Sequence, residues 1–301
     1  MARNILITGA EGQLGKSLQR ILRDKFEVVP TDLITTESGS SPHIKYLDIT
    51  ERSDVVRTIN EINPDIIINC AAYTDVDGSE RNKNKAYLVN VVGLENLLNA
   101  SDYNTYFIQI SSDYVFDGKG GPYSEEDHTY PINFYGKTKL EAENILSGSR
   151  REYLIIRPNV LYCEDLFVKG NFFSWVYKSL LNNKPISVVM DQISNPTYVP
   201  HLAHAIFQCI LLNTTGIYHF GSDDYISRYE FALAIAENLE LDSSLITAIN
   251  SEELALINPS YISQRPRHSG LKTFKIEDEI GLTIHSIDYC INLLKNSIVT
   301  T

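Results

Sequence analysis

Short apolar runs alternate with segments of helical period along the first 160 residues of the chain. The runs hold few polar residues, as expected of parallel strands covered on both faces, and they span residues 4–8, 26–30, 44–49, 66–73, 106–110 and 153–157. Residues 51–62 and 87–99 are expected to form helices between strands. This alternation predicts an α/β fold with a doubly wound parallel sheet.

The pattern loosens after residue 160. Helical period returns at residues 201–212, a short strand is expected at 217–220, and Ser227 with Glu230 has the spacing of a capping box before a helix at 231–239. We therefore expect a first domain over residues 1–160, completed by about 186–222. A smaller α/β domain would comprise residues 161–185 and 223–301.

A glycine-rich turn follows the first strand directly. Gly9, Gly12 and Gly15 are spaced Gly-x-x-Gly-x-x-Gly and lead into a periodic helix, so that Gln13 and Leu14 lie at its start. Such a turn points backbone N–H groups and a helix N-terminus at a pyrophosphate. Three glycines can also form an ordinary turn, but their place between strand and helix favours a dinucleotide site.

The second strand ends near Asp32, about twenty residues past the glycines, as the ribose-binding acid of a dinucleotide site does. A carboxylate there accepts hydrogen bonds from the adenosine ribose hydroxyls and repels a 2′-phosphate. No Arg or Lys follows until Lys45, so NADH is favoured over NADPH. The alternative for Asp32 is a plain turn aspartate. Asp48 and the adjacent Ile49 are assigned to the adenine edge.

The fourth apolar run ends in small residues, where a cofactor can lie close to the backbone. We assign Ala71, Ala72 and Tyr73 to cofactor binding for this reason, together with Asn90 on the following helix.

Tyr135 and Lys139 are four residues apart in a segment rich in helix formers, which places both side chains on one helix face. An ammonium beside a phenol favours the phenolate and lowers the tyrosine pKa from about 10. Such a phenol can exchange a proton with a carbinol oxygen, and Ser112, after the apolar run 106–110, can supply a second hydroxyl. The alternative is a surface pair on an amphipathic helix.

Composition narrows the class of protein. The formal net charge is −12, which argues against a nucleic-acid partner and against anionic membrane surfaces because the field would repel both. The four cysteines are widely spaced, without metal-ligand spacing, and indicate a reducing compartment. No signal-peptide pattern and no apolar run of about 18 residues is found. We expect a cytoplasmic protein.

Taken together, the glycine turn, Ser112 to Gly118, Tyr135 to Lys139 and Arg157-Pro resemble the extended short-chain dehydrogenase/reductase superfamily. Ala71 to Asp77, Asp191-Gln192, Pro196-Thr197 and Arg265-Pro266 with Ser269 make the chain most similar to the dTDP-4-dehydrorhamnose reductase family.

The resemblance implies a Rossmann-type domain with a smaller C-terminal domain that binds a nucleotide-linked sugar. It also implies transfer of hydride from NAD(P)H to a C4 ketone of that sugar. Tyr135 would then protonate the C4 oxygen, Lys139 would hold the nicotinamide ribose, and Ser112 would hydrogen-bond the carbonyl oxygen. Asp113 and Tyr114 would contact the sugar.

Further substrate contacts are expected in the second domain. Arg265 lies in a compact cationic cluster of an acidic chain and can pair bidentately with a pyrophosphate; the alternative is a surface turn paired with Glu277 and Asp278. The remaining candidates have equally good structural explanations as cap or core residues, and they are Asn171, Phe172, Gln192 and Thr197.

Two departures from the family pattern matter. Ser17 stands where some members carry a glutamate used in a metal site at a dimer interface, so no metal is predicted and a homodimer is left open. Gly78 stands where a lysine is common.

Three functions remain open at this point. The chemistry predicted above is that of a sugar-nucleotide reductase. An epimerase of the same superfamily is harder to exclude than a dehydratase, which would carry an Asp-Glu pair after Ser112. A non-catalytic regulatory subunit similar to the beta subunit of methionine adenosyltransferase is the third.

Overall fold

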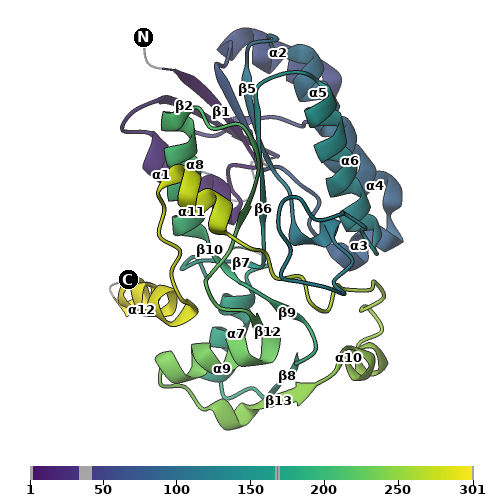
Figure 1. Ribbon diagram of the computed structural model, residues 1–301, viewed down its shortest axis with the longest axis vertical. Coiled ribbons are helices and arrows are strands. Elements are labelled where there is room, and N and C mark those ends of the chain that lie inside the picture. Colours follow the sequence, from purple (N-terminus) through teal and green to yellow (C-terminus); the bar gives the residue numbers. More distant parts are fainter. Residues whose placement is uncertain (1–2, 34–42, 167, 169, 300–301) are drawn as a thin grey trace.

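The computed structural model describes residues 3–33, 43–166, 168 and 170–299 (Figure 1). Its centre is a seven-stranded parallel sheet with the order β11-β6-β5-β4-β1-β2-β3. The strands of this sheet are β1 (Asn4–Thr8), β2 (Glu27–Asp32), β3 (Lys45–Tyr46), β4 (Ile66–Asn69), β5 (Tyr106–Ile110), β6 (Tyr153–Pro158) and β11 (Gly216–Phe220). The predicted doubly wound α/β fold is confirmed.

Helices cover both faces of the sheet (Figure 1). One face packs on α1 (Gln13–Leu22), α8 (Val199–Leu212) and α11 (Phe274–Ile280). The other face packs on α2 (Arg52–Ile62), α5 (Gly93–Ala100) and α6 (Phe134–Gly148). Near the carboxyl ends of the strands lie α3 (Val76–Arg81), α4 (Lys83–Tyr87), the π-helical turn η1 (Leu88–Val92) and the 3₁₀ turn η2 (Asp113–Val115).

Burial on both faces explains why the central strands are apolar throughout. In β1, Ile5 and Ile7 pack on the α1/α8 side while Leu6 packs on the α2/α5 side, and all three are fully buried. Successive side chains of a strand point to opposite faces, so a strand between two helix layers needs an apolar residue at every position.

A second lobe lies below the carboxyl edge of the sheet in Figure 1. Its core is built from α7 (Phe172–Leu181), α9 (Arg228–Asn238) and α12 (Ile287–Val299) against the parallel pair β8 (Ile186–Val189) and β13 (Ile246–Ile249). Its remaining elements are β7 (Leu161–Tyr162) paired with β10 (Thr197–Tyr198), β9 (Ile193–Ser194) paired with β12 (Ile226–Ser227), the 3₁₀ turn η3 (Ser243–Leu245) and α10 (Ser251–Ile257). The capping box predicted for Ser227 and Glu230 is present at the start of α9.

Several expected elements differ in the structure. The strand expected at 44–49 is reduced to two residues, and the helix expected at 87–99 is interrupted by η1. Within 186–222, the return to the central sheet is made by α8 and β11, whereas β8 pairs with β13 in the second lobe. The helices α10 and α11 were not predicted; each has only seven residues.

Within the described part of the chain, no helix is both long and apolar enough to cross a membrane.

Candidate active site

The glycine-rich turn brings three backbone segments into close contact. Gly9 has φ +64°, and a Cβ there would lie 2.6 Å from the backbone nitrogen of Ala71. A Cβ on Gly15 would collide with the backbone of Gly9 and Ala10. Gly12 is the N-cap of α1 and offers no side-chain cap, so the first N–H groups of the helix remain available. This arrangement fits a pyrophosphate, as the sequence predicts.

Asp32 lies at the carboxyl end of β2 beside this turn. Its Oδ2 accepts a hydrogen bond from the backbone N–H of Glu11 at 2.8 Å, and its Oδ1 accepts one from Leu33 at 2.6 Å. The carboxylate thus fixes the turn to the strand end and remains partly exposed. Asp48 accepts hydrogen bonds from the backbone and hydroxyl of Thr50. Both acids are on the side of the sheet where the prediction places adenosine.

Two of the predicted cofactor residues contribute mainly to the core. Leu14 is buried in the cluster beneath α1. Ile49 is buried where α5 begins, and a Cβ on Gly93 would meet its side chain. Their side chains therefore shape the site from beneath.

The carboxyl end of β4 is held in place by Asn90. The Asn90 amide accepts from the backbone N–H of Tyr73 at 2.7 Å and donates to the Tyr73 carbonyl and to the Thr138 hydroxyl. Asn90 is itself buried, whereas Ala71 and Ala72 are only partly buried. Asn90 thus fastens the segment predicted to lie along the cofactor to the helix that carries Tyr135.

Helix α6 presents Tyr135 and Lys139 at the end of β5. Asn133 caps the helix by accepting from a backbone N–H three residues on, at 2.8 Å. Lys139 is buried, and its Nζ donates to the Ile110 carbonyl at 2.5 Å. Because Ser112 follows Ile110 by two residues, the hydroxyl predicted to assist catalysis lies next to this helix. The structure therefore brings the three predicted catalytic residues together.

The electrostatics of this group differ from the expectation. Burial raises the pKa of Tyr135, the charge of Asp113 raises it further, and the neighbouring Ser112 hydroxyl lowers it. Burial also lowers the pKa of Lys139 to about 8. The prediction that Lys139 lowers the pKa of Tyr135 is wrong for this structure, because loss of solvent outweighs charge effects and the ammonium is bonded to Ile110.

Asp113 and Tyr114 follow the serine in the 3₁₀ turn η2. The buried Asp113 accepts hydrogen bonds from Ser112 Oγ at 3.0 Å and Ser269 Oγ at 2.6 Å, and burial raises its pKa to about 6. Tyr114 packs edge-on against Tyr135 with ring centroids 5.7 Å apart. Asp113 thus orients the Ser112 hydroxyl and ties it to the C-terminal segment. Its predicted contact with sugar stays a prediction.

A buried ion pair supports α6 from behind. Arg157 donates to Glu143 through Nε at 2.9 Å and Nη2 at 2.6 Å, and each side chain is 3% exposed. Arg157 Nη1 also lies 3.3 Å from His219 Nε2 on β11. Glu143 stands one helical turn after Lys139, so this network fixes the helix against β6 and β11.

Arg265 is engaged by the first lobe. Its guanidinium makes a bidentate pair with Asp77, with distances of 2.7 and 2.5 Å, and lies 4.3 Å from the ring centroid of Tyr261. Asp77 also accepts from the backbone N–H groups of Ile262 and Ser263. The partner of Arg265 is therefore Asp77 of α3, and neither Glu277 nor Asp278.

The four remaining substrate candidates have structural partners. Asn171 caps α7 and donates to the Cys163 carbonyl at 2.9 Å, and the Phe172 ring stacks on Phe231. Gln192 donates to Ser251 and Tyr261. Thr197 has no exposed surface, and its hydroxyl donates to the Phe220 carbonyl at 3.2 Å. These contacts favour cap and core roles for Asn171 and Thr197.

Arg228 was missed by the sequence analysis. It is the first residue of α9, and its guanidinium lies 5.2 Å from the Phe172 ring centroid. Burial raises the pKa of Asp113 and of Tyr114, and the charge of Arg228 partly opposes both shifts. The only signal in the sequence was its position directly after the capping serine Ser227. That signal concerns helix formation and says nothing of the site.

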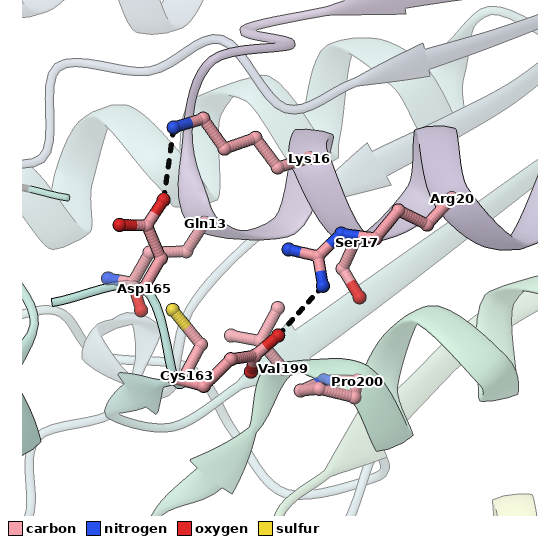
Figure 2. Close-up of a pocket in the computed structure, with 9 residues that line it drawn as sticks. Gln13, Lys16, Ser17, Arg20, Cys163, Asp165, Val199 and Pro200 are labelled. Carbon is pink, nitrogen blue, oxygen red and sulfur yellow. Dashed lines mark hydrogen bonds and ion pairs between the residues drawn. The ribbon is translucent and has the colours of Figure 1, made fainter. Parts of the chain in front are cut away.

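A narrow crevice lies between α1 and the loop that precedes α7 (Figure 2). Gln13 lines it, and two ion pairs cross it, Lys16–Asp165 at 3.0 Å and Arg20–Glu164 at 2.8 Å. None of the three catalytic candidates lines this crevice. We interpret it as a charged junction between the two lobes.

Residues 3–33, 43–166, 168 and 170–299 contain no group of three or more His, Cys, Asp or Glu side chains that could hold a metal ion. Ser17, which replaces the glutamate expected in some family members, lines the crevice of Figure 2.

Comparison with known proteins agrees with this geometry. Residues 3–296 match the family model described as RmlD substrate binding domain. A dTDP-4-dehydrorhamnose reductase of Aggregatibacter actinomycetemcomitans is 35% identical over 94% of this chain and 94% of its own length. The chain belongs to the dTDP-4-dehydrorhamnose reductase family.

Two further relatives bear on the alternatives. The crystal structure of a Bacillus anthracis member of this family in complex with NADP is 32% identical, has a TM-score of 0.88, and covers 99% of this chain and 100% of its own. A methionine adenosyltransferase 2 subunit beta from Xenopus tropicalis is 32% identical over 93% of this chain and 83% of its own length. Membership of the superfamily is therefore confirmed, and both relatives span nearly the whole chain.

Proposed function

We propose that this protein is an NAD(P)H-dependent reductase that converts the C4 ketone of a nucleotide-linked 6-deoxy sugar into an alcohol, as in the formation of dTDP-L-rhamnose. The observation that carries the proposal is the convergence of Ser112, Tyr135 and Lys139 at the carboxyl end of β5. They lie in the same fold as a glycine turn shaped for a pyrophosphate. Family membership supports the same substrate class.

The chain's own residues perform the proton chemistry. When bound, the reduced nicotinamide cofactor would supply the hydride that reduces the ketone carbon. Tyr135 donates its proton to the developing C4 alkoxide, and Ser112 hydrogen-bonds the same oxygen. Tyr135 is protonated at neutral pH, as a proton donor must be, and the burial that raises its pKa makes it a weaker acid than a free phenol. In this structure the Ser112 hydroxyl donates its one proton to Asp113, so it must turn away from that carboxylate to donate to the substrate oxygen.

For the cofactor we propose a preference for NADH. The support is the Asp32 carboxylate at the end of β2, which would repel a 2′-phosphate. The NADP bound in the Bacillus anthracis relative argues in the other direction. Asp32→Ala is therefore expected to raise kcat/KM for NADPH relative to NADH. An unchanged ratio would refute the role given to Asp32.

The decisive test is Tyr135→Phe, assayed by oxidation of reduced nicotinamide with dTDP-4-keto-L-rhamnose. Loss of the proton donor is expected to lower kcat by about 10²–10⁴-fold while cofactor binding is retained. Tyr130→Phe is the matched control, because Tyr130 precedes the same helix and is 69% exposed. Normal turnover by Tyr135→Phe would refute the mechanism.

One observation supports the regulatory-subunit alternative, namely the 32% identity to a methionine adenosyltransferase 2 subunit beta. A regulatory subunit would co-purify with a synthetase and would show no turnover with any 4-keto sugar nucleotide. A panel of dTDP-, UDP- and GDP-linked 4-keto sugars distinguishes the two functions. The same panel also identifies the nucleotide.

A further inference from the structure

Arg228, at the start of α9, is an arginine of the second lobe whose charge acts on two residues of the candidate site. Among the described residues, no hydrogen bond and no ion pair is made by the side chain of Arg228, which is partly buried. Its backbone N–H donates to the Gln192 carbonyl, which fixes the start of α9. A guanidinium that has lost part of its water without gaining an acceptor is suited to bind an anion.

The guanidinium of Arg228 lies close enough to two residues beside the proposed catalytic Ser112 to act on them electrostatically. It lies 5.2 Å from the centroid of the Phe172 ring, and Phe172 in turn stacks on Phe231 with an interplanar angle of 17°. An aromatic face restricts a guanidinium to few orientations. The charge also acts on Asp113 and Tyr114, which directly follow Ser112. Arg228 therefore lies within electrostatic range of the reacting end of the site.

The other arginines near the site are already neutralised. Arg265 pairs with Asp77, Arg267 pairs with Glu252 and Asp191, and Arg157 pairs with Glu143. A nucleotide-linked sugar carries its negative charge on a diphosphate, and the net charge of this chain is −12. Binding such an anion requires a local cation with free donors. Arg228 meets this requirement.

We propose that Arg228 binds the diphosphate of the nucleotide-linked sugar and so sets the affinity for diphosphate-bearing substrates. The proposal rests on the function proposed above and adds a recognition residue to it. Phe172 acts as the platform that orients the guanidinium. Its assignment to substrate binding then becomes indirect, through Arg228.

The experiment measures binding of dTDP and thymidine to the full chain by calorimetry, for wild type, Arg228→Gln and Arg228→Lys. Charge-assisted hydrogen bonds of this kind predict that Arg228→Gln weakens dTDP binding about 10- to 100-fold. Arg228→Lys, which keeps the charge but loses the planar fork, is expected to lose less. Thymidine binding and the Kd for the nicotinamide cofactor should stay unchanged in both variants.

Arg57→Gln is the matched control, because Arg57 lies on α2 and its side chain is 65% exposed. In turnover, Arg228→Gln should raise KM for the sugar nucleotide with little change in kcat. The thermal midpoint of each variant shows whether the fold is intact.

The outcomes separate the two proposals. If wild type turns over but Arg228→Gln and Arg228→Lys bind dTDP within twofold of wild type, the role of Arg228 is refuted and the reductase function stands. Equal weakening of dTDP and thymidine binding also refutes a diphosphate contact. If wild type neither binds dTDP nor reduces any sugar nucleotide, both proposals fail.

Discussion

Helix α6, which carries two of the proposed catalytic residues, and the second-lobe substrate candidates Arg265, Asn171 and Thr197, called the wall below, are held in different ways. On α6, Tyr135 and Lys139 lie one turn apart, and the next turn carries Glu143, whose buried pair with Arg157 fixes the helix to the sheet. On the wall, Arg265 is held by Asp77, which lies 188 residues away in the sequence. Local spacing arranges the chemistry in the first case, and contacts between lobes arrange it in the second.

This difference shows which residues can be assigned from the spacing of a local sequence motif alone. The proposed catalytic residues of α6 occupy the positions that helical periodicity assigns to them. Asn171 and Thr197, for which substrate contact and a cap or core role were equally open, use their polar atoms to cap a helix and to bond a strand end. A residue of the wall is free for substrate only if no other part of the chain has engaged it.

The largest expected effect comes from the buried pair behind α6. Arg157→Met leaves Glu143 buried without a partner, and we expect the free energy of unfolding to fall by about 3–5 kcal/mol. Denaturant unfolding measures this. The double variant Glu143→Leu/Arg157→Met should recover much of the loss, because it removes the unpaired charge.

Arg57→Met serves as the surface comparison for this pair. The Arg57–Asp54 pair is on the exposed face of α2 and is expected to contribute no more than about 1 kcal/mol. A loss of that size in Arg157→Met would show that the buried pair does not hold the helix.

The sequence predicts much of the fold because burial on both faces leaves a clear pattern. The apolar runs at β1, β4 and β5 are of this kind. The strand expected at residues 44–49 is reduced to the two residues of β3, and the seven-residue helix α10 was not predicted, because so few residues leave little periodicity.

The site divides in the same way. The spacing of Tyr135 and Lys139 is local and was predicted. The pKa of Tyr135 was not, since it depends on burial by the whole fold. The pairing of Arg265 with Asp77 and the stacking of Arg228 on Phe172 join distant segments, and no local pattern reports them.

The second test concerns the Asp77–Arg265 contact between the lobes. Asp77 and Arg265 are 16% and 12% exposed, and their bidentate contact is expected to show a coupling energy of about 1.5–3 kcal/mol in a double-mutant cycle of Asp77→Asn and Arg265→Gln. KM for the sugar nucleotide tells whether Arg265 also binds substrate. If it does, Arg265→Gln raises KM more than Asp77→Asn does. Equal changes in KM would show that Arg265 serves only to join the two lobes through Asp77.

The smallest expected effect decides between two roles of Asn171. Its Oδ1 accepts from the backbone N–H of Ser174, and its Nδ2 donates to the carbonyls of Cys163 and Asp165. Asn171→Ala should therefore lower the free energy of unfolding by about 1 kcal/mol, as loss of an N-cap does, and leave KM for the sugar nucleotide unchanged.

Asn171→Ser is the control, because serine restores the cap acceptor but not the amide donor, and it should recover part of the stability. A several-fold rise in KM in both variants, without a matching loss of stability, would instead place the Asn171 amide on the substrate. In that case a wall residue whose hydrogen bonds are structural would also bind substrate, and its hydrogen bonds alone would not reveal its function.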